Sequence, residues 1–179
     1  VSQCGNYILV YNWEIYNYIE IRAKLERLNV KFRTHSDTEV LLQGLIIWGL
    51  DLLPKLEGMF SFAFLDKSSM QLLCARDPFG IKPFYYHYSK GNLVFASEIA
   101  PVRDLAYPGE VNQKILTDFL LDGSYDHSNE SFYSNVMSLG AGECLNYCLD
   151  SNKIKIHKWF SQSDRSNNKS NYDEIVLET

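Results

Sequence analysis

The sequence lacks any apolar run that approaches the roughly 20 residues needed to cross a membrane. Its first four residues, VSQC, contain neither a basic segment nor an apolar stretch, so no secretory signal is predicted. Basic residues are also few, with 17 Lys and Arg against 22 Asp and Glu and a net charge of −5. A mildly acidic chain is not attracted to phosphate backbones. We therefore expect a cytoplasmic protein that binds neither membranes nor nucleic acid.

Cysteine is scarce, with residues only at positions 4, 74, 144 and 148. None belongs to a Cys-x-x-Cys pair, and no His or Cys stands near Cys144 and Cys148 at the spacing of a zinc site. The four histidines are scattered along the chain. The sequence therefore predicts buried free thiols and no metal site.

What the chain does contain is apolar and aromatic side chains, at 46% and 14% of its 179 residues, which is enough for one well-filled domain. The stretch 59–65 is apolar at nearly every position, which predicts a strand covered on both faces. The other segments whose periodicity or composition predicts an element are strands at 6–11, 72–76, 84–88, 93–96, 143–149 and 153–159, and helices at about 16–29, 37–49, 52–56, 98 onward and 115–121. This order favours an α+β fold with sheets layered between helices.

Ser36 and Glu39 have the spacing of a capping box at the start of the second helix. In that arrangement the Ser36 side chain accepts from the Glu39 amide, and the Glu39 carboxylate accepts from the Ser36 amide. Asp37 is then the first helical residue.

The composition changes after Phe160 to Ser, Asn, Asp and Lys. Residues 161–171 are therefore predicted to be a linker. The segment from Tyr172 onward is interpreted as the start of another helix. The expected organisation is one domain over 1–160, followed by a linker and the start of a helix over 161–179.

Five stretches carry distinctive sequences: NWEIYNY at 12–18, FRTHSDTEV at 32–40, LEGMFSFAF at 56–64, ARDPFGIKPFYY at 75–86 and FASEI at 95–99. In this order they resemble the class II glutamine amidotransferase domain of asparagine synthetase B, and weaker similarity continues from 138–142 to 158–159. The resemblance implies a four-layer αββα sandwich of the N-terminal-nucleophile hydrolase type, incomplete here at its N-terminus. ARDPFGIKP lacks the Gly-rich form of a phosphate loop, so we interpret it as a structural connection between strands.

The resemblance also implies a chemistry. In this family an N-terminal Cys attacks the amide of glutamine, its own α-amino group serves as the base, and the ammonia released goes to a second domain that activates aspartate with ATP. Asn12 would supply the oxyanion hole together with the backbone N–H of the next residue, here Trp13. Glu14 would help to hold glutamine, and Asp37 would bind its α-ammonium group.

Simpler roles exist for the same residues. Asn12 could end a strand in a turn, where Asn is common. Glu14 and Asp37 could complement the dipole of a helix start. Because a carboxylate at a helix start can also bind a ligand, these roles do not exclude each other.

Two departures from the family bear on activity. Cys4 precedes Asn12 by only seven intervening residues and has residues before it, so its nitrogen is an amide that cannot act as the base. Trp13 stands where the family has Gly, which would cost about 1 kcal/mol or more if that position requires a positive φ. We therefore expect no nucleophile in this chain and no glutaminase activity from it alone.

The sequence also contains no ATP-pyrophosphatase loop of the Ser-Gly-Gly-x-Asp-Ser type. We therefore expect a chain truncated at both ends, which has no cofactor of its own. ATP and Mg²⁺ would bind only in a missing synthetase domain, which is the expected partner beside glutamine. A second copy in a homodimer is a further candidate partner. The alternatives are a degenerate, non-catalytic domain used for binding or assembly, and an amidotransferase of a specialised pathway with a different acceptor.

Overall fold

The structure is a computed structural model that describes residues 1–2, 4–105 and 109–161, together with the backbone of 174–176. The side chain of Trp13 also lies outside the described part. The strands are β1 (Tyr7–Ile15), β2 (Gly58–Asp66), β3 (Gln71–Arg76), β4 (Tyr85–Ser89), β5 (Asn92–Ala96), β6 (Met137–Ser138), β7 (Glu143–Cys148), β8 (Lys153–Lys158) and β9 (Glu174–Val176). The helices are α1 (Tyr18–Arg27), α2 (Asp37–Trp48), the 3-10 helix η1 (Gly49–Lys55), α3 (Ile99–Leu105) and α4 (Gln113–Asp122).

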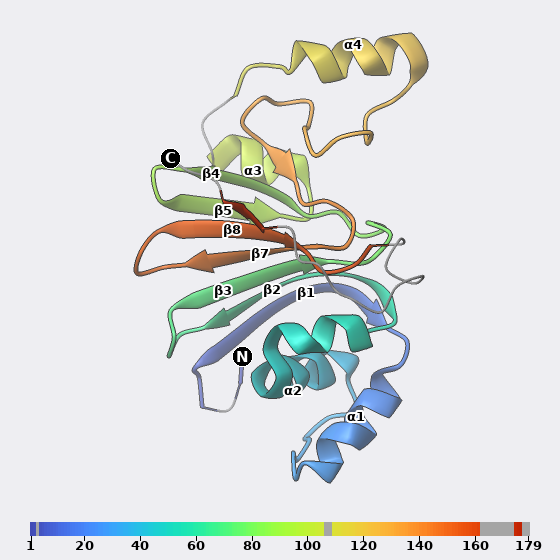
Figure 1. Cartoon of the computed structure of the whole chain (residues 1–179), viewed down its shortest axis with the longest axis vertical. Coiled ribbons are helices and arrows are strands. Elements are labelled where there is room, and N and C mark those ends of the chain that lie inside the picture. The colour runs from blue at the N-terminus through green and yellow to red at the C-terminus, as the bar shows by residue number, and fades with distance from the viewer. Residues whose placement is uncertain (3, 106–108, 162–173, 177–179) are drawn as a thin grey trace.

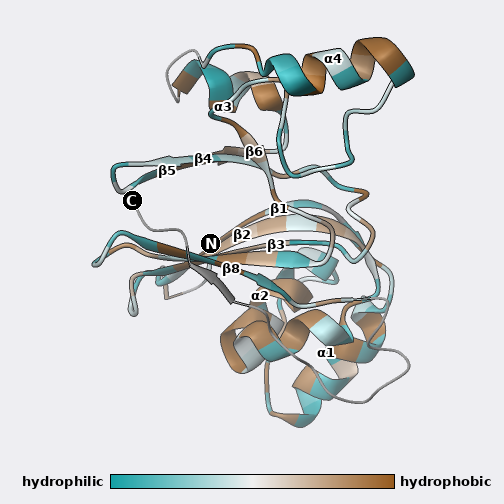
Figure 2. Cartoon of the chain, turned by 45° about the horizontal axis from the view of Figure 1, so that its top comes forward, coloured by the Kyte–Doolittle hydropathy of each residue, from teal (hydrophilic) through white to brown (hydrophobic). Residues whose placement is uncertain are grey.

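Two antiparallel sheets form the centre of the molecule. The larger has the strand order β1-β2-β3-β7-β8-β9, and the smaller has the order β5-β4-β6. Helices α1 and α2 cover one face of the larger sheet, the smaller sheet lies against its other face, and α3 and α4 lie beyond the smaller sheet (Figures 1 and 2). The predicted α+β fold with four αββα layers is confirmed.

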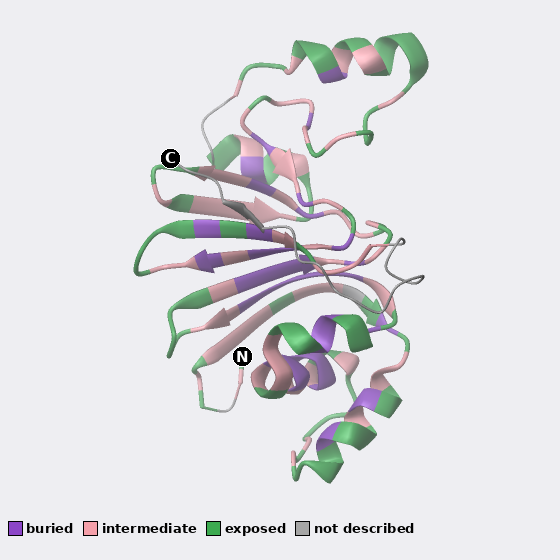
Figure 3. Ribbon diagram, in the orientation of Figure 1, coloured by how far each residue is buried: buried purple, intermediate pink, exposed green. Residues whose placement is uncertain are grey.

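The core divides into two clusters because the side chains of β2 alternate between the faces of the sheet. Phe60, Phe62 and Phe64 pack with α1, α2 and η1, whereas Ala63 faces the smaller sheet with Phe84. Strand β2 is therefore buried on both faces, as its composition predicts, and it is flanked by β1 and β3 (Figure 3).

Strand β1 is longer than the sequence indicates. It continues through Ile15, and Asn12 lies within it opposite Ser61 rather than in a turn after it. Glu14 pairs with Met59 in the same ladder, so it is not part of the first turn of α1. Pairing with β2 stabilises an extended backbone here, although the polar residues suggest that the strand has ended.

The segment after 172 was expected to begin a helix, but residues 174–176 form strand β9. Its backbone pairs antiparallel with β8, opposite Lys155, Ile156 and His157. Ile175 and Val176 are β-branched, which favours a strand when a partner edge is present. The predicted linker at 161–171 lies outside the described residues except for Ser161.

Helix α2 begins at Asp37 and ends before Gly49, as predicted. The capping box differs, because the Ser36 side chain accepts from the Thr38 amide at 3.1 Å and not from the amide of Glu39. The Glu39 carboxylate reaches past Ser36 to the loop before it. The two residues therefore stabilise the helix start without bonding reciprocally.

The connection at 76–83 is structural, as expected from its sequence. Asp77 is fully buried and accepts backbone N–H bonds from Phe79, Ile81 and Lys82 at 2.9–3.0 Å. The aspartate replaces the backbone partners that a tight loop between β3 and β4 cannot supply itself.

Candidate functional site

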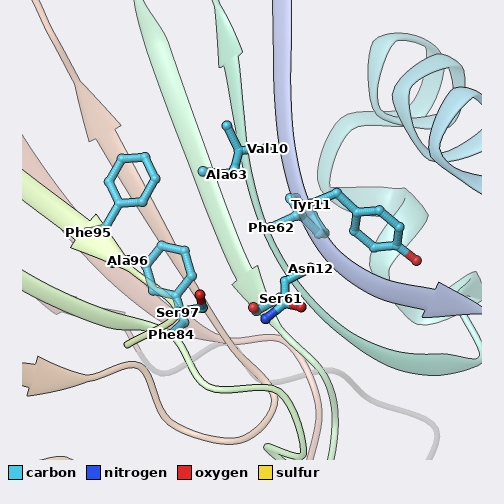
Figure 4. A pocket seen from close by; sticks show the side chains of 10 residues that line it. All are labelled: Val10, Tyr11, Asn12, Ser61, Phe62, Ala63, Phe84, Phe95, Ala96 and Ser97. Atoms are coloured by element: carbon cyan, nitrogen blue, oxygen red, sulfur yellow. The ribbon is translucent and has the colours of Figure 1, made fainter. Parts of the chain in front are cut away.

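Asn12 lines a cavity of about 400 Å³ between the two sheets. The other residues around it are Val10, Tyr11, Ser61, Phe62, Ala63, Phe84, Phe95, Ala96 and Ser97. Figure 4 shows the Asn12 side chain next to Ser61, with Phe84, Phe95 and Ser97 across from them. Ser61 already donates to the Pro83 carbonyl at 3.0 Å. The Asn12 amide is therefore one of the few polar groups that a small ligand would meet in a mostly apolar cavity.

Asp37 lies beside the same strand, although 26 positions separate it from Tyr11. Its Oδ2 atom accepts from the Tyr11 hydroxyl at 3.0 Å and from the Ile15 backbone N–H at 3.2 Å. These two donors belong to residues on either side of Asn12 in the sequence. The structure thus brings Asp37 to the segment that carries Asn12.

The two side chains approach β1 from different directions. Tyr11 and Asn12 project to opposite sides of the strand, which Figure 4 shows directly. Glu14 lies two residues after Asn12, so its side chain projects to the same side of β1, where it is exposed. Neither Glu14 nor Asp37 lines the cavity around Asn12. The three residues share one stretch of β1, but the structure does not place them around a single cavity.

The backbone N–H group of Trp13 points away from β2. The Ile15 N–H leaves the sheet at its outer edge to reach Asp37, and backbone groups two residues apart along a strand point to the same side. The Trp13 N–H therefore lies on the outer edge that Asp37 occupies. Trp13 is paired opposite Phe60 within β1, so this position takes an ordinary strand conformation, which any residue adopts. The expected backbone penalty for replacing Gly does not arise.

None of the four cysteines lines the cavity that contains Asn12. Cys4 is exposed, and a hydrogen bond with the Ser2 hydroxyl is the main cause that lowers its pKa. It precedes Tyr7 at the start of β1, and Asn12 stands about 17 Å further along that strand. Burial raises the pKa of Cys74 and raises that of Cys144 to about 12, so both remain neutral thiols. The fourth, Cys148, ends β7, whose neighbours are β3 and β8 and not β1.

The loop before Asp37 is fixed by Glu39. The Glu39 carboxylate accepts from the backbone N–H groups of Arg33 and Thr34 and from the Thr34 hydroxyl, at 3.0, 2.7 and 2.6 Å. Arg22 donates to the Thr34 carbonyl at 2.7 Å. Burial raises the pKa of Glu39, but the Thr34 and Arg33 bonds and the Arg22 charge together lower it below its usual value. The start of α2, and with it Asp37, is anchored through this network.

We expect Glu39→Gln to lower the free energy of unfolding by about 1 kcal/mol at pH 7. The effect is small because solvent screens the charge of this partly exposed carboxylate. The folded pKa of Glu39 lies below its usual value of 4.5, so the stabilisation is complete above about pH 4.5 and is lost as the pH falls through the folded pKa. Urea unfolding of both proteins between pH 7 and pH 3 should show the difference disappearing in acid. Glu20→Gln, on the exposed side of α1, is the matched control.

A difference that persists unchanged at pH 3 would contradict this account, because it would show that the Glu39 charge contributes nothing. In that case the loss would come from the amide NH₂ group, which cannot accept the bonds that a carboxylate oxygen accepts, and not from the charge.

Comparison with known proteins shows the family. The family described as "Glutamine amidotransferase domain" matches residues 1–160. The chain belongs to this family. It is 34% identical over 181 residues to a putative glutamine-hydrolysing asparagine synthetase from Mycobacterium bovis, covering 95% of this chain and 28% of the relative. It is 36% identical over 169 residues to glutamine-hydrolysing asparagine synthetase 2 from Bacillus subtilis, covering 92% of this chain and 22% of the relative. The amidotransferase domain thus spans about a quarter of the length of these relatives.

Solved structures share the fold at lower identity. The glutamine phosphoribosylpyrophosphate amidotransferase from B. subtilis, complexed with ADP and GMP, has a TM-score of 0.60 at 20% identity, over 90% of this chain and 31% of that chain. A structure described as the allosteric regulatory enzyme of purine biosynthesis has a TM-score of 0.62 at 20% identity, over 90% of this chain and 30% of that chain. Both likenesses concern the arrangement of helices and strands. The amidotransferase domain therefore has the expected fold of N-terminal-nucleophile hydrolase type.

In the part of the amidotransferase domain that the structure describes, no three His, Cys, Asp or Glu side chains gather where they could hold a metal ion. Among the same residues no helix is long and apolar enough to span a membrane. The four cysteines are free thiols, of which Cys74 and Cys144 are buried as predicted, whereas Cys4 is exposed and Cys148 is half-buried.

The sequence does not identify Tyr11 as a candidate site residue, although its hydroxyl contacts Asp37 directly. The sequence offers one indication, the alternation of side chains along a strand: Tyr11 and Ile15 face the same side of the strand that carries the candidate residues. That signal becomes useful only when the strand is known to extend through Ile15.

Proposed function

We propose that this domain is the glutaminase half of a glutamine-dependent asparagine synthetase, which releases ammonia from glutamine for the amidation of aspartate. The observation that carries the proposal is Asp37, whose carboxylate accepts from Tyr11 and Ile15 at the outer edge of β1, the edge toward which the Trp13 N–H also points. One site there could offer a carboxylate to an α-ammonium group and an N–H donor to an oxyanion. The names of the relatives support glutamine as the substrate.

Each candidate residue has a role in this proposal. Asp37 binds the α-ammonium group of glutamine, and Glu14 helps to hold the substrate. When a thiolate attacks the side-chain amide, negative charge develops on the amide oxygen. The Trp13 N–H at the outer edge of β1 donates to that oxygen, and the Asn12 amide, which lines the cavity between the sheets, joins it by turning toward that edge. Donors of this kind supply a large share of the stabilisation in acyl transfer. Ammonia leaves, and water then hydrolyses the thioester to glutamate.

The nucleophile is not among the cysteines described above. Cys4 stands at the far end of β1, and burial keeps Cys74 and Cys144 neutral. The thiolate would therefore come from a part of the protein outside residues 1–179, and we propose that this chain alone releases no glutamate. ATP and Mg²⁺ would act in a separate synthetase domain, which is the proposed partner and which determines the acceptor.

Glutamine binding tests the proposal without requiring turnover. We expect wild-type protein to bind glutamine with a Kd in the millimolar range, which is about −4 kcal/mol, in an NMR titration. Asp37→Asn removes the charge that pairs with the ammonium group and should raise the Kd about tenfold, which is about 1.4 kcal/mol. Glutamate release in the same samples should remain at the level of the blank.

Asp51→Asn is the matched control, because Asp51 is an exposed carboxylate on η1 away from β1. It should leave the Kd unchanged. If wild-type protein does not respond to glutamine, Trp13→Gly decides between a blocked site and none. Glutamine binding by Trp13→Gly would show that the indole obstructs the site. Absence of binding in both proteins would contradict the proposal and favour a non-catalytic domain used for binding or assembly.

A further inference from the structure

The two carboxylate oxygens of Asp37 have different surroundings. Oδ2 accepts two hydrogen bonds from β1, from the Tyr11 hydroxyl at 3.0 Å and from the Ile15 N–H at 3.2 Å. Oδ1 has a contact of 3.4 Å with the hydroxyl of the neighbouring Thr38, which is at the limit of a hydrogen bond. A carboxylate can accept about four hydrogen bonds. The arrangement thus fixes one oxygen against the strand and leaves the other with capacity for a cationic donor.

Without these donors the carboxylate would have little reason to face β1. Asp37 is the first residue of α2, where a carboxylate can turn to the N–H groups of its own helix. The terminal torsion of an Asp side chain is also broad and poorly restrained. The hydrogen bonds to Oδ2 select one orientation among these. Of the two donors, only the Tyr11 hydroxyl belongs to a side chain, so a substitution can remove it alone.

Tyr11 is well suited to remain a donor. It is half-buried, and burial together with the nearby Asp37 carboxylate raises the pKa of its hydroxyl well above the usual value. The hydroxyl therefore stays protonated throughout the neutral range. The ring projects from β1 on the side opposite the Asn12 side chain (Figure 4), although Tyr11 is among the residues that line the cavity. Its polar contact is the one with Asp37.

We propose that Tyr11 is a positioning residue for substrate recognition, which acts through Asp37 by holding its carboxylate toward the α-ammonium group of glutamine. The proposal rests on the function proposed above, and it assigns a role to a residue that does not itself touch the substrate. It also predicts selectivity: Tyr11 should matter for ligands that carry an α-amino group and not for ligands that lack one.

The test compares glutamine with glutaramate, which has the same amide and carboxylate but no α-amino group. In NMR titrations of the full chain, Tyr11→Phe should weaken glutamine binding about fivefold, which corresponds to about 1 kcal/mol. Binding of glutaramate should not change. Tyr16→Phe is the matched control, since Tyr16 is an exposed tyrosine just after the same strand, and it should affect neither ligand.

A double-mutant cycle shows whether Tyr11 acts through Asp37. In the Asp37→Asn background, Tyr11→Phe should weaken glutamine binding by less than twofold, because the group that it positions has already lost its charge. A full fivefold loss in that background would overturn the inference, as would equal weakening of both ligands by Tyr11→Phe. The second outcome would mean that the ring only supports the strand.

Urea unfolding without ligand, carried out on the wild type, Tyr11→Phe, Asp37→Asn and the double variant, separates this inference from the proposed function. Coupling between Tyr11 and Asp37 in unfolding, with no glutamine binding by the wild type, would show that the proposed function is wrong and that the contact is only structural. Glutamine binding that depends on Asp37 but not on Tyr11 would overturn this inference alone. Supporting results are coupling in unfolding together with selective loss of glutamine binding.

Discussion

Replacing Arg76 with Met is expected to lower the free energy of unfolding by about 3 kcal/mol. Arg76 is half-buried where β3 ends. Its guanidinium group donates to Lys82 O at 2.7 Å, Ser138 Oγ at 3.0 Å, Leu139 O at 2.6 Å and Gly80 O at 2.6 Å. Methionine keeps most of the aliphatic stem but none of the donors. Each of the three carbonyl oxygens left without its partner should cost roughly 1 kcal/mol.

This arginine joins parts of the chain that are distant in sequence. Gly80 and Lys82 lie in the connection between β3 and β4, whereas Ser138 belongs to β6 of the smaller sheet. Loss of the guanidinium should therefore loosen the smaller sheet from the larger one. Hydrogen exchange should show this as faster exchange of amides in β4 and β6 than in β2.

Arg103→Met is the matched control for Arg76→Met. Arg103 donates to the Asp104 carboxylate and to the Tyr133 hydroxyl, and its ion pair with Asp104 is exposed. Its loss should be much less damaging, since exposed ion pairs contribute little. Equal midpoints in urea for the two variants would contradict the role assigned to Arg76.

Local patterns were sufficient to predict much of this fold. Helix α2 could be located because Ser36 and Gly49 mark its ends, and β2 because the apolar run 59–65 fits a strand covered on both sides. Both signals arise within the element itself. The resemblance to asparagine synthetases then added the order of the layers, which periodicity alone supports only weakly.

The errors lie where pairing with a distant strand decides the conformation. Strand β1 reaches Ile15 because Gly58 and Met59 pair with it, and a sequence in which the apolar pattern stops at Tyr11 does not reveal that partner. Strand β9 depends in the same way on the edge of β8. Local propensity cannot anticipate such contacts, since it contains no information about the partner.

The candidate site shows the same division. Asp37 could be named from its sequence motif, but its contact with Tyr11 depends on a fold that joins positions 26 residues apart. Glu39 was expected to bond Ser36 locally, and it bonds Arg33 and Thr34 because the loop turns back over the helix start. Residue identities were therefore available from the sequence, whereas their partners were not.

Gly58→Ala is expected to damage both stability and the candidate site, because Gly58 lies directly opposite Ile15 in the ladder between β1 and β2. A Cβ atom on Gly58 would stand 2.4 Å from the Glu14 carbonyl oxygen and 3.0 Å from the Ile15 Cα. Both atoms belong to the backbone, so they cannot move aside as a flexible side chain could. The strand itself must shift, and overpacking of this kind costs about 3 kcal/mol.

The shift would occur where Ile15 donates to Asp37, so the variant should also bind glutamine at least about tenfold more weakly, or about 1.4 kcal/mol. Gly123→Ala provides the contrast: a Cβ there meets nothing within 4 Å, but the residue is in the left-handed region with φ at +78°. Its cost should be about 1 kcal/mol, from backbone strain alone, with no effect on glutamine. Urea unfolding and glutamine titration of both variants measure the two effects. If Gly58→Ala is no less stable than Gly123→Ala, the close approach of β1 and β2 at this point is wrong, and the position assigned to Asp37 beside Ile15 is wrong with it.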